Sequence, residues 1–250
     1  MKDLFFFDGN CRIGDNLEKM PGTKELLAEM DRYGVDKALV RHNAIAPGGA
    51  AYTNENITEL LKEDVEKRLV GVWSILPDTC GEQPEPDQFF KEMKENRIGA
   101  ITLSPVQHRY IPRRNVIGKI MDAARERKVP VLLNAFAEKW YELYDFMEQF
   151  PDNICIYTEA CGKWGYDRYI QPLLDSYSNF YFGTAGYWVQ DGISDLVKKY
   201  GAERFIYGSN FPRYNHGNGM LQIKHAGLKD EEIRKIAGEN LNSLLNGADL

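Results

Sequence analysis

Five polar residues stand at the ends of apolar, strand-like runs of the sequence: Asn10, Arg12, Asn134, Glu159 and Asn210. An arginine side chain stays charged and donates hydrogen bonds without accepting any, so Arg12 suits a carboxylate or phosphate ligand. Glu159 is the acid of this group and would move protons, with a pKa set by burial and by Arg12. The three asparagines would orient hydroxyl or carbonyl groups of a substrate. This pattern is typical of a site that binds a small anion.

The same residues also admit a purely structural interpretation. Arg12 and Glu159 would then form an internal ion pair, and the three asparagines would complete a hydrogen-bond network around it. A buried network of this kind is costly when it is only partly satisfied, so it must be nearly complete if it is structural. The sequence leaves both interpretations open.

The sequence has four histidines, and three of them follow strand-like runs or lie in the loop after the last run. We expect His42 and His108 to reach the same site as acid or base, and His216 to contact the substrate. A packed or solvated side chain is the alternative for each, and a metal site made of all three is another. Trp188 and Arg213 lie in neighbouring loops and would add a stacking wall and a positive charge.

Eight apolar runs rich in β-branched and aromatic residues predict strands covered on both faces, at 4–10, 37–41, 69–76, 99–104, 130–135, 154–159, 180–184 and 204–208. Amphipathic segments lie between and after them, at 23–33, 54–68, 86–96, 115–127, 138–150, 166–176, 191–200 and 229–245. This alternation predicts an α/β protein with a single-domain (β/α)8 TIM barrel over residues 1–250. Such barrels carry their chemistry at the carboxyl ends of the strands, here called the mouth, where the polar residues above would meet.

Four of these strand ends have recognisable motifs. The first run ends in Asp-Gly-Asn-Cys-Arg-Ile-Gly (8–14), and the fifth reads Pro-Val-Leu-Leu-Asn (130–134). The sixth ends in Thr-Glu-Ala-Cys-Gly (158–162), and the eighth reads Gly-Ser-Asn-Phe-Pro (208–212). Together with the closing helix at 236–245, these segments resemble the amidohydrolase-related family, a branch of the amidohydrolase superfamily of metal-dependent hydrolases and decarboxylases.

The resemblance implies the frame of a metal hydrolase, but every position of the usual ligand set departs from the family pattern. Histidines are replaced at Asn10, Arg12, Asn134 and Glu159, and Asn210 replaces an aspartate that binds metal and handles the proton of the attacking water. A guanidinium about 4 Å from a dication would be repelled by roughly 8 kcal/mol at an effective dielectric constant of 20. We therefore expect a degenerate metal site with no metal and no other cofactor.

The function we predict is metal-independent hydrolysis of a small carboxylated or sugar-derived compound, such as a lactone, at the mouth. Arg12 would anchor the anion, while Glu159 or a histidine moves the proton. One alternative is a catalytically inactive relative that binds a small metabolite or serves as a partner subunit. Another alternative is a metal hydrolase whose ligands lie outside the family pattern.

Composition narrows the choice of partners. The net charge of −6 and the lack of a basic tract give nucleic-acid binding no support. No apolar run approaches the roughly 20 residues that span a bilayer, so we expect no membrane partner. We expect a cytoplasmic protein whose partner is a small anionic molecule, with a homodimer as one possible assembly. The four cysteines lack metal-type spacing and are expected to be reduced core thiols.

Overall fold

The computed structural model describes residues 4–15, 20–43, 49–137, 139–158 and 167–250. Within these residues, eight strands form one sheet in chain order, and each pairs in parallel with the next. They are β1 (Phe7–Ile13), β2 (Lys37–His42), β3 (Leu69–Ser74), β4 (Ile98–Thr102), β5 (Val131–Leu132), β6 (Cys155–Tyr157), β7 (Phe180–Gly183) and β8 (Phe205–Ile206).

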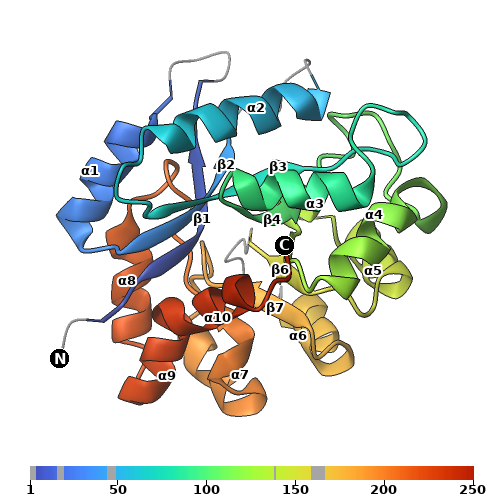
Figure 1. Ribbon diagram of the computed structural model, residues 1–250. Coiled ribbons are helices and arrows are strands. Elements are labelled where there is room, and N and C mark those ends of the chain that lie inside the picture. Colours follow the sequence, from blue (N-terminus) through green and yellow to red (C-terminus); the bar gives the residue numbers. More distant parts are fainter. Residues whose placement is uncertain (1–3, 16–19, 44–48, 138, 159–166) are drawn as a thin grey trace.

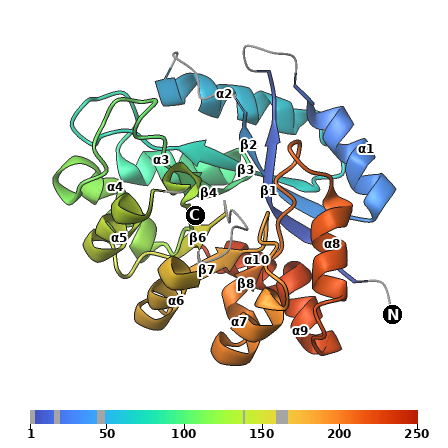
Figure 2. The same ribbon diagram turned by 180° about the vertical axis from the view of Figure 1, so that it is seen from behind.

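Helices lie outside the strands around the sheet (Figures 1 and 2). In the described residues they are α1 (Thr23–Tyr33), α2 (Gly49–Lys62), α3 (Pro86–Glu95), α4 (Arg114–Glu126), α5 (Trp140–Gln149), α6 (Asp167–Ser176), α7 (Gly192–Tyr200), α8 (His216–Lys224), α9 (Asp230–Arg234) and α10 (Asn240–Asn246). The alternation of strand and helix confirms the predicted (β/α)8 TIM barrel. None of these helices is long and apolar enough to cross a membrane.

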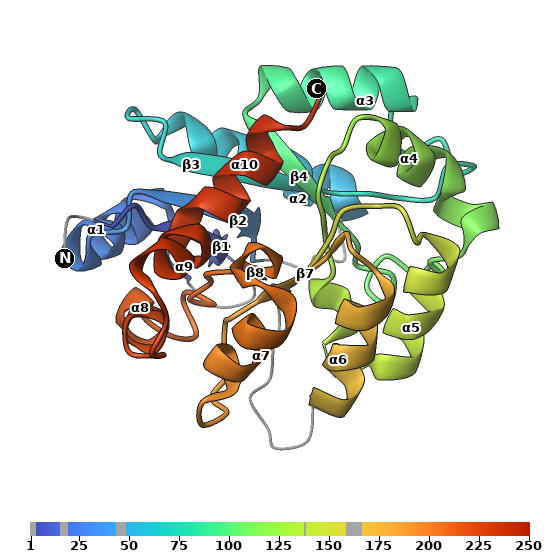
Figure 3. The same ribbon diagram turned by 90° about the horizontal axis from the view of Figure 1, so that it is seen from below.

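An apolar cluster, which we call the floor, fills the amino-terminal half of the barrel interior. It contains Phe7, Leu39, Val72, Ala100, Leu132, Ile156 and Ile206 from the strands and Leu241 from α10, each at most 3% exposed. Helix α10 crosses this end of the barrel (Figure 3), and its Leu244 and Leu245 pack against the same cluster. Inward side chains stacked in layers are the usual core of such barrels. The floor leaves the mouth as the end that is open to polar chemistry.

The seam between β8 and β1 closes the barrel with few backbone hydrogen bonds. Gly9 N donates to Tyr207 O at 2.8 Å, and Arg12 N donates to Phe211 O at 2.9 Å. Because β8 has only two residues, the chain that continues from it supplies most of the contact with β1. This continuation carries Asn210, so the seam determines where Asn210 lies.

Two of the segments that differ from the sequence expectations lie near the mouth. The run at 130–135 becomes a two-residue strand followed by the 3-10 turn Asn134–Phe136, in which Ala137 N donates to Asn134 O. The residues after the eighth strand, expected as a loop, become helical from His216, where α8 begins. The side chain of Asn215 caps this helix by accepting from Asn218 N at 3.2 Å. Two glycines in the first half of α8 weaken its helical pattern and hide the helix in the sequence.

Three of the four cysteines lie in the described residues, all as free thiols. Cys11 and Cys155 are buried, as expected, but Cys80 is exposed because it lies on the loop that follows β3. Cys161 lies outside the described residues. The expectation of core thiols therefore holds for two positions and is wrong for Cys80.

Candidate functional site

A layer of polar side chains lies above the floor, toward the mouth. Successive side chains of a strand point to opposite faces, so the residue two positions after a floor residue points inward again. From β2 to β6 this residue is polar in every case: Arg41, Ser74, Thr102, Asn134 and Thr158. We call these five residues the polar layer. They stand directly over an apolar core, where the effective dielectric is low and polar contacts are strong.

Arg12 reaches across the seam to Asn210. Its Nη2 atom donates to Asn210 Oδ1 at 2.9 Å. Asn210 has a φ of 62°, a left-handed conformation that asparagine adopts more readily than most residues. The Nε atom of Arg12 is buried and has no acceptor among the described residues. The guanidinium is therefore held at one end, while a donor at the other end is available to a ligand.

Asn10 spans the barrel from β1 to the end of β6. Its Nδ2 atom donates to Thr158 O at 3.0 Å, and the side chain is 3% exposed. The Oδ1 atom of Asn10 and the hydroxyl of Thr158 are buried without hydrogen-bond partners in the described part of the chain. Buried polar atoms of this kind are costly unless a water, an ion or a ligand completes the bond. The mouth therefore offers an acceptor as well as the Arg12 donor.

A small cavity lies between the ends of β2, β3, β4 and β5. Its lining residues in the described chain are Arg41, His42, Thr53, Val72, Ser74, Thr102, Ser104, His108 and Asn134. The enclosed space is about 20 Å³, which admits a group of about the size of one water molecule. One wall belongs to the polar layer, where Thr102 Oγ1 donates to Asn134 Oδ1 at 2.5 Å.

His108 lines this cavity with both ring nitrogens buried and without hydrogen-bond partners in the described residues. Burial lowers the pKa of His108, and the charge of Glu82 opposes this effect only in part. The ring is therefore neutral at pH 7 and has the protonation state that a general base needs. His42 lines the same cavity, is 8% exposed, and lies edge-on to the ring of Tyr52 at 6.2 Å.

A buried carboxylate, that of Asp8, joins the two edges of the barrel. It accepts from Ser209 N at 3.0 and 3.1 Å and from Asn10 N at 2.9 Å, and His216 Nδ1 lies 2.8 Å from its Oδ2. Burial alone would raise the pKa of Asp8, but the hydrogen bond and charge of His216 and the bonds from Ser209 and Asn10 hold it below its ordinary value of 3.8. We call Asp8, Ser209 and His216 the seam clamp.

The seam clamp fixes the residues on both sides of the mouth contact. Asn10 and Arg12 follow Asp8 along β1, while Asn210 follows Ser209 directly. The hydrogen bond between Arg12 and Asn210 thus connects two segments that the Asp8 carboxylate already holds together.

His216 begins helix α8 and lies on the outer side of the barrel wall. Its ring stacks on Phe211 with 5.7 Å between ring centroids, and its carbonyl accepts from Tyr207 OH at 3.0 Å. The side chain has no exposed surface and binds Asp8. In this structure the His216 side chain is part of the seam clamp. Its contact with a substrate stays a prediction.

Trp188 and Arg213 meet at the rim of the mouth through Tyr214. The Trp188 ring lies edge-on to that of Tyr214 at 5.0 Å, and the Arg213 guanidinium lies 5.4 Å from the centroid of the same ring. Trp188 is 54% exposed, so it is accessible to solvent. The stacking and charge assigned to these two residues from the sequence stay predictions.

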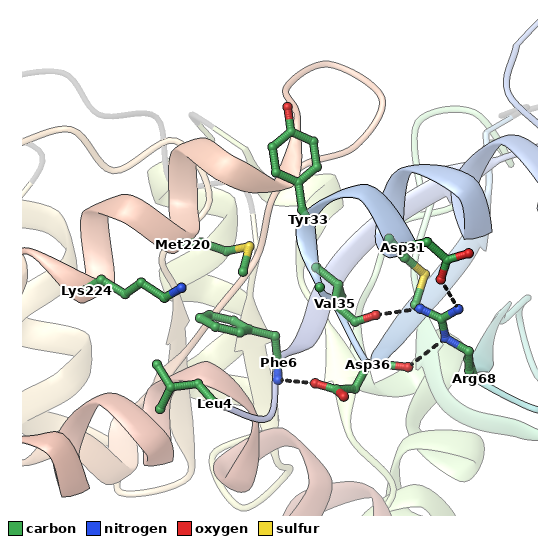
Figure 4. A pocket seen from close by; sticks show the side chains of 11 residues that line it. Leu4, Phe6, Asp31, Tyr33, Val35, Asp36, Arg68, Met220 and Lys224 are labelled. Carbon is green, nitrogen blue, oxygen red and sulfur yellow. Dashed lines mark hydrogen bonds and ion pairs between the residues drawn. The ribbon is translucent and has the colours of Figure 1, made fainter. Parts of the chain in front are cut away.

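A larger groove of about 720 Å³ lies near the opposite end of the barrel, between α1 and α8 (Figure 4). Barrel enzymes use the carboxyl ends of their strands, whereas this groove adjoins the amino ends of β1 and β2. Its arginine, Arg68, is already bonded to Asp31 Oδ1 at 2.5 Å and to Val35 O at 2.6 Å. The guanidinium of Arg68 is therefore already paired within the protein, unlike the Nε atom of Arg12, which has no acceptor among the described residues.

Listing the polar residues at the predicted strand ends identifies only some of the residues of this site. Arg41 and Thr102 were not singled out from the sequence, although alternation from Leu39 and Ala100 identifies both as inward-pointing. Glu159 lies outside the described residues, so neither its pairing with Arg12 nor its catalytic role is tested.

Sequence comparison agrees with the fold. The family profile described as amidohydrolase matches residues 19–241. The chain belongs to the amidohydrolase family. Because this match begins after β1, the assignment of Asn10 and Arg12 to the family's first ligand positions rests on the β1 motif and on strand order. No curated protein matches the sequence.

Several solved structures share the whole barrel with this chain. A TIM-barrel protein from Bordetella bronchiseptica has 15% identity and a TM-score of 0.70, covering 98% of this chain and 99% of its own. A probable 2-pyrone-4,6-dicarboxylic acid hydrolase from Acinetobacter baumannii, with citric acid bound, has 12% identity and a TM-score of 0.72, covering 96% and 99%.

A further similar structure is the 5-carboxyvanillate decarboxylase from Novosphingobium aromaticivorans, with manganese bound. It has 13% identity and a TM-score of 0.73, covering 97% of each chain. At such low identities these likenesses show the fold alone, so the chemistry of this chain has to be argued from its own residues.

The described residues that the strand-end motifs align with the metal ligands of the family do not fit a divalent cation. Asn10, Arg12, Asn134 and Asn210 supply three amides and one guanidinium, whereas zinc-type sites use imidazole, thiolate or carboxylate ligands. The oxygen of Asn210 already accepts from Arg12, so a cation bound there would lie next to a fixed positive charge.

One other group in the described chain has metal-ligand chemistry. Asp8, Cys11 and His216 place their ligand atoms within 4.8 Å of one another. The oxygens of Asp8 are occupied by N–H donors, and burial together with the charge of Asp8 raises the pKa of Cys11 well above its usual range. This group fits a hydrogen-bonded clamp better than a metal centre.

The substitution Asp8→Asn tests the seam clamp. Removing one partner of a buried charged pair should reduce the free energy of unfolding by about 3–5 kcal/mol at pH 7. Since the pKa of Asp8 is lower folded than unfolded, its contribution is present above the ordinary value of 3.8 and is lost as pH falls through the folded value. The gap between wild type and variant in urea unfolding should therefore narrow below pH 3.8.

The matched control is Asp31→Asn, since the Asp31 side chain is 66% exposed and pairs with Arg68. It should change the free energy of unfolding by less than about 1 kcal/mol. An Asp8→Asn protein as stable as the control variant would contradict the clamp.

Proposed function

We propose that this amidohydrolase-family protein binds a small carboxylated compound at the barrel mouth and hydrolyses it without a divalent metal. The observation that carries the proposal is the 2.9 Å hydrogen bond from Arg12 to Asn210. It supports a positive charge at the position that the strand-end motifs assign to the family's metal. The buried Nε of Arg12 lacks an acceptor among the described residues, and a carboxylate oxygen would provide one. A carboxylated lactone or another small ester has the required chemistry.

His108 is the residue to which we assign proton transfer. Its neutral ring would take a proton from a water molecule as the water oxygen bonds to the carbonyl carbon of the substrate. The ester C–O bond then breaks, and the leaving oxygen takes the proton from His108. The amides of Asn10 and Asn134 would orient the carbonyl and hydroxyl groups. Other contacts and alternative proton carriers assigned from the sequence stay predictions: His42, Glu159, Trp188, Arg213 and His216.

Two structural relatives support a carboxylated substrate by what they are reported to act on or bind. One is the probable dicarboxylic acid hydrolase with citric acid bound, and the other is the carboxyvanillate decarboxylase. The decarboxylase holds manganese, so the metal-free part of the proposal rests on the donor set of this chain alone.

A binding protein without turnover is the second candidate. Asn210 replaces the aspartate that handles a proton in the family, and its side-chain oxygen is bonded to Arg12. This contact favours binding over catalysis. Incubation with carboxylated lactones, followed by proton NMR, separates the two candidates, because only an enzyme would accelerate ring opening.

The cellular location and the assembly of the protein are also part of the proposal. We place it in the cytoplasm, with a small anion as its partner and a homodimer as its assembly. Cell fractionation and light scattering on the purified protein test these two points.

The substitution Arg12→Gln tests anion binding at the mouth. Isothermal titration calorimetry with citrate should show binding to the wild type and at least about ten-fold weaker binding to the variant, because hydrogen bonds to charged groups contribute about 1.5–3 kcal/mol. Arg32→Gln, on the outer surface of α1 with its side chain 70% exposed, is the control and should bind citrate like the wild type. Equal affinity in all three proteins would refute the assignment of Arg12.

The protonation state of His108 gives a test that needs no substrate. Proton NMR of the imidazole rings should show one histidine with a titration midpoint below 6.5, because burial lowers the pKa of His108. The sequence has only four histidines, so loss of that signal in His108→Gln assigns it. A midpoint at or above 6.5 would mean that His108 is charged at the lower end of the physiological range and would argue against its role as base.

A further inference from the structure

A backbone turn after the carboxyl end of β4 holds Ser104 and His108 together. His108 N donates to Ser104 O at 2.9 Å, so the chain between them closes one helical turn. Residues four positions apart in such a turn are neighbours on one face, with Cβ atoms about 5–6 Å apart. Both residues also line the small cavity between the ends of β2 and β5. A hydroxyl group and an imidazole therefore border the same water-sized space.

The hydroxyl groups that line this cavity are not equally available for chemistry. Thr53 donates to a backbone carbonyl of α2 at 2.9 Å, and Thr102 donates to Asn134 Oδ1 at 2.5 Å. The other two hydroxyl groups of the described lining belong to Ser74 and Ser104, for which the described residues provide no such bond. The backbone turn joins only Ser104 to an imidazole. Ser104 is therefore the hydroxyl that is best placed to lose its proton.

The ring of His108 is ready to accept a proton. Both of its nitrogens are buried and have no hydrogen-bond partner among the described residues. Burial lowers the pKa of His108 and keeps the ring neutral, while the charge of Glu82 acts in the opposite direction and stabilises the ring once it is protonated. The enclosed space of about 20 Å³ admits one water molecule. A proton can pass from a hydroxyl to the ring directly or through one such water.

Asn134 adds hydrogen-bond donors to the same cavity. Its Oδ1 accepts from Thr102, so the Nδ2 atom, with two N–H donors, is the end of this amide that is left for a ligand. Donors that are fixed before the reaction stabilise the negative charge that develops on a carbonyl oxygen under attack. Two neighbouring strand ends, those of β4 and β5, thus supply a hydroxyl, a base and a donor for the carbonyl oxygen.

We infer that Ser104 is a nucleophile and that hydrolysis at the mouth proceeds through an ester formed on its Oγ atom. This inference rests on the proposed function and refines its first step. His108 takes the proton of the Ser104 hydroxyl as Oγ bonds to the carbonyl carbon of the substrate. The C–O bond of the substrate ester then breaks, and the leaving oxygen takes the proton from His108.

Water enters in the second step. His108 takes a proton from water as the water oxygen bonds to the carbonyl carbon of the Ser104 ester. The bond from this carbon to Oγ breaks, and Oγ takes the proton from His108, which restores the serine and releases the acid. The proton transfer from water to His108 is the one in the proposed function, but its target is the Ser104 ester instead of the substrate itself.

A small sulfonyl fluoride tests the inference on the full chain. Methanesulfonyl fluoride transfers its sulfonyl group to the oxygen of a nucleophilic serine, with loss of fluoride and of the hydroxyl proton, and the product does not turn over. A small reagent is needed because Ser104 is only 9% exposed. Mass spectrometry of the protein and of its peptides should show one sulfonyl group on Ser104 of the wild type, and the opening of carboxylated lactones should be lost in parallel.

Three variants complete the experiment. Ser104→Ala should stay unmodified in the same peptide. His108→Gln should react at Ser104 at least about a hundred-fold more slowly, because a general base contributes about 10²–10⁴ to the rate. Ser243→Ala changes an exposed residue of α10, at the other end of the barrel, and is the control that should react like the wild type. Peptide mapping of the wild type locates the sulfonyl group even if Ser104→Ala does not fold.

The possible failures differ from one another. If the wild type opens lactones while Ser104 stays unmodified, the inference is wrong and direct attack by water, as in the proposed function, stands. If Ser104 stays unmodified and no lactone is opened, the inference and the proposed function both fall. Equal rates of sulfonylation at Ser104 in the wild type and in His108→Gln would also overturn the inference, because the serine would then react without its base.

Discussion

The Asp8 carboxylate is the interaction on which the rest of this barrel depends. A sheet of eight strands closes only if its first and last strands are held together, and β8 contributes just two residues to that contact. Asp8 adds to this short contact. Its carboxylate accepts from Asn10 N on one side of the seam and from Ser209 N on the other, and it also binds His216 of α8. A buried carboxylate is tolerated here because each bond it accepts favours the charged form. The hydrogen bonds of Asp8 thus both close the barrel and position the residues of the mouth.

The arrangement of side chains at the mouth follows from this closure and from the alternation of inward and outward side chains along the strands. Apolar side chains form the floor, and polar side chains occupy the next inward position from β2 to β6. Arg12 and Asn210 meet over the seam, at positions that the strand-end motifs assign to the family's metal ligands. The charge at that place is still positive, but it is carried by a side chain that donates hydrogen bonds and cannot act as a Lewis acid. The chemistry that suits such a site is recognition of an anion, with proton transfer left to a neutral base such as His108.

The sequence predicted the barrel because its elements depend on local pattern. Apolar runs and amphipathic segments can be recognised in the sequence alone, and the strand order and the family profile confirm the fold and the family. The replaced ligand positions stay a prediction from the strand-end motifs. Contacts between segments that are distant in the sequence could not be predicted in this way. The bond from Asp8 to His216 joins residues 208 positions apart, and only the folded chain shows that this histidine starts a helix on the outer wall. Arg41 was missed because the inward direction of its side chain depends on which residues form the barrel core, and Glu159 stays untested outside the described residues.

The most direct test is to identify what binds at the mouth. The claim under test is that the Arg12 guanidinium lies where the strand-end motifs place the metal of the family. Crystals of the protein grown with both manganese and citrate would show it by anomalous scattering and electron density. A carboxylate oxygen within hydrogen-bond distance of Arg12, with no manganese among Asn10, Asn134 and Asn210, is the predicted result. Manganese bound by these side chains, with the guanidinium of Arg12 turned away from Asn210, would contradict it.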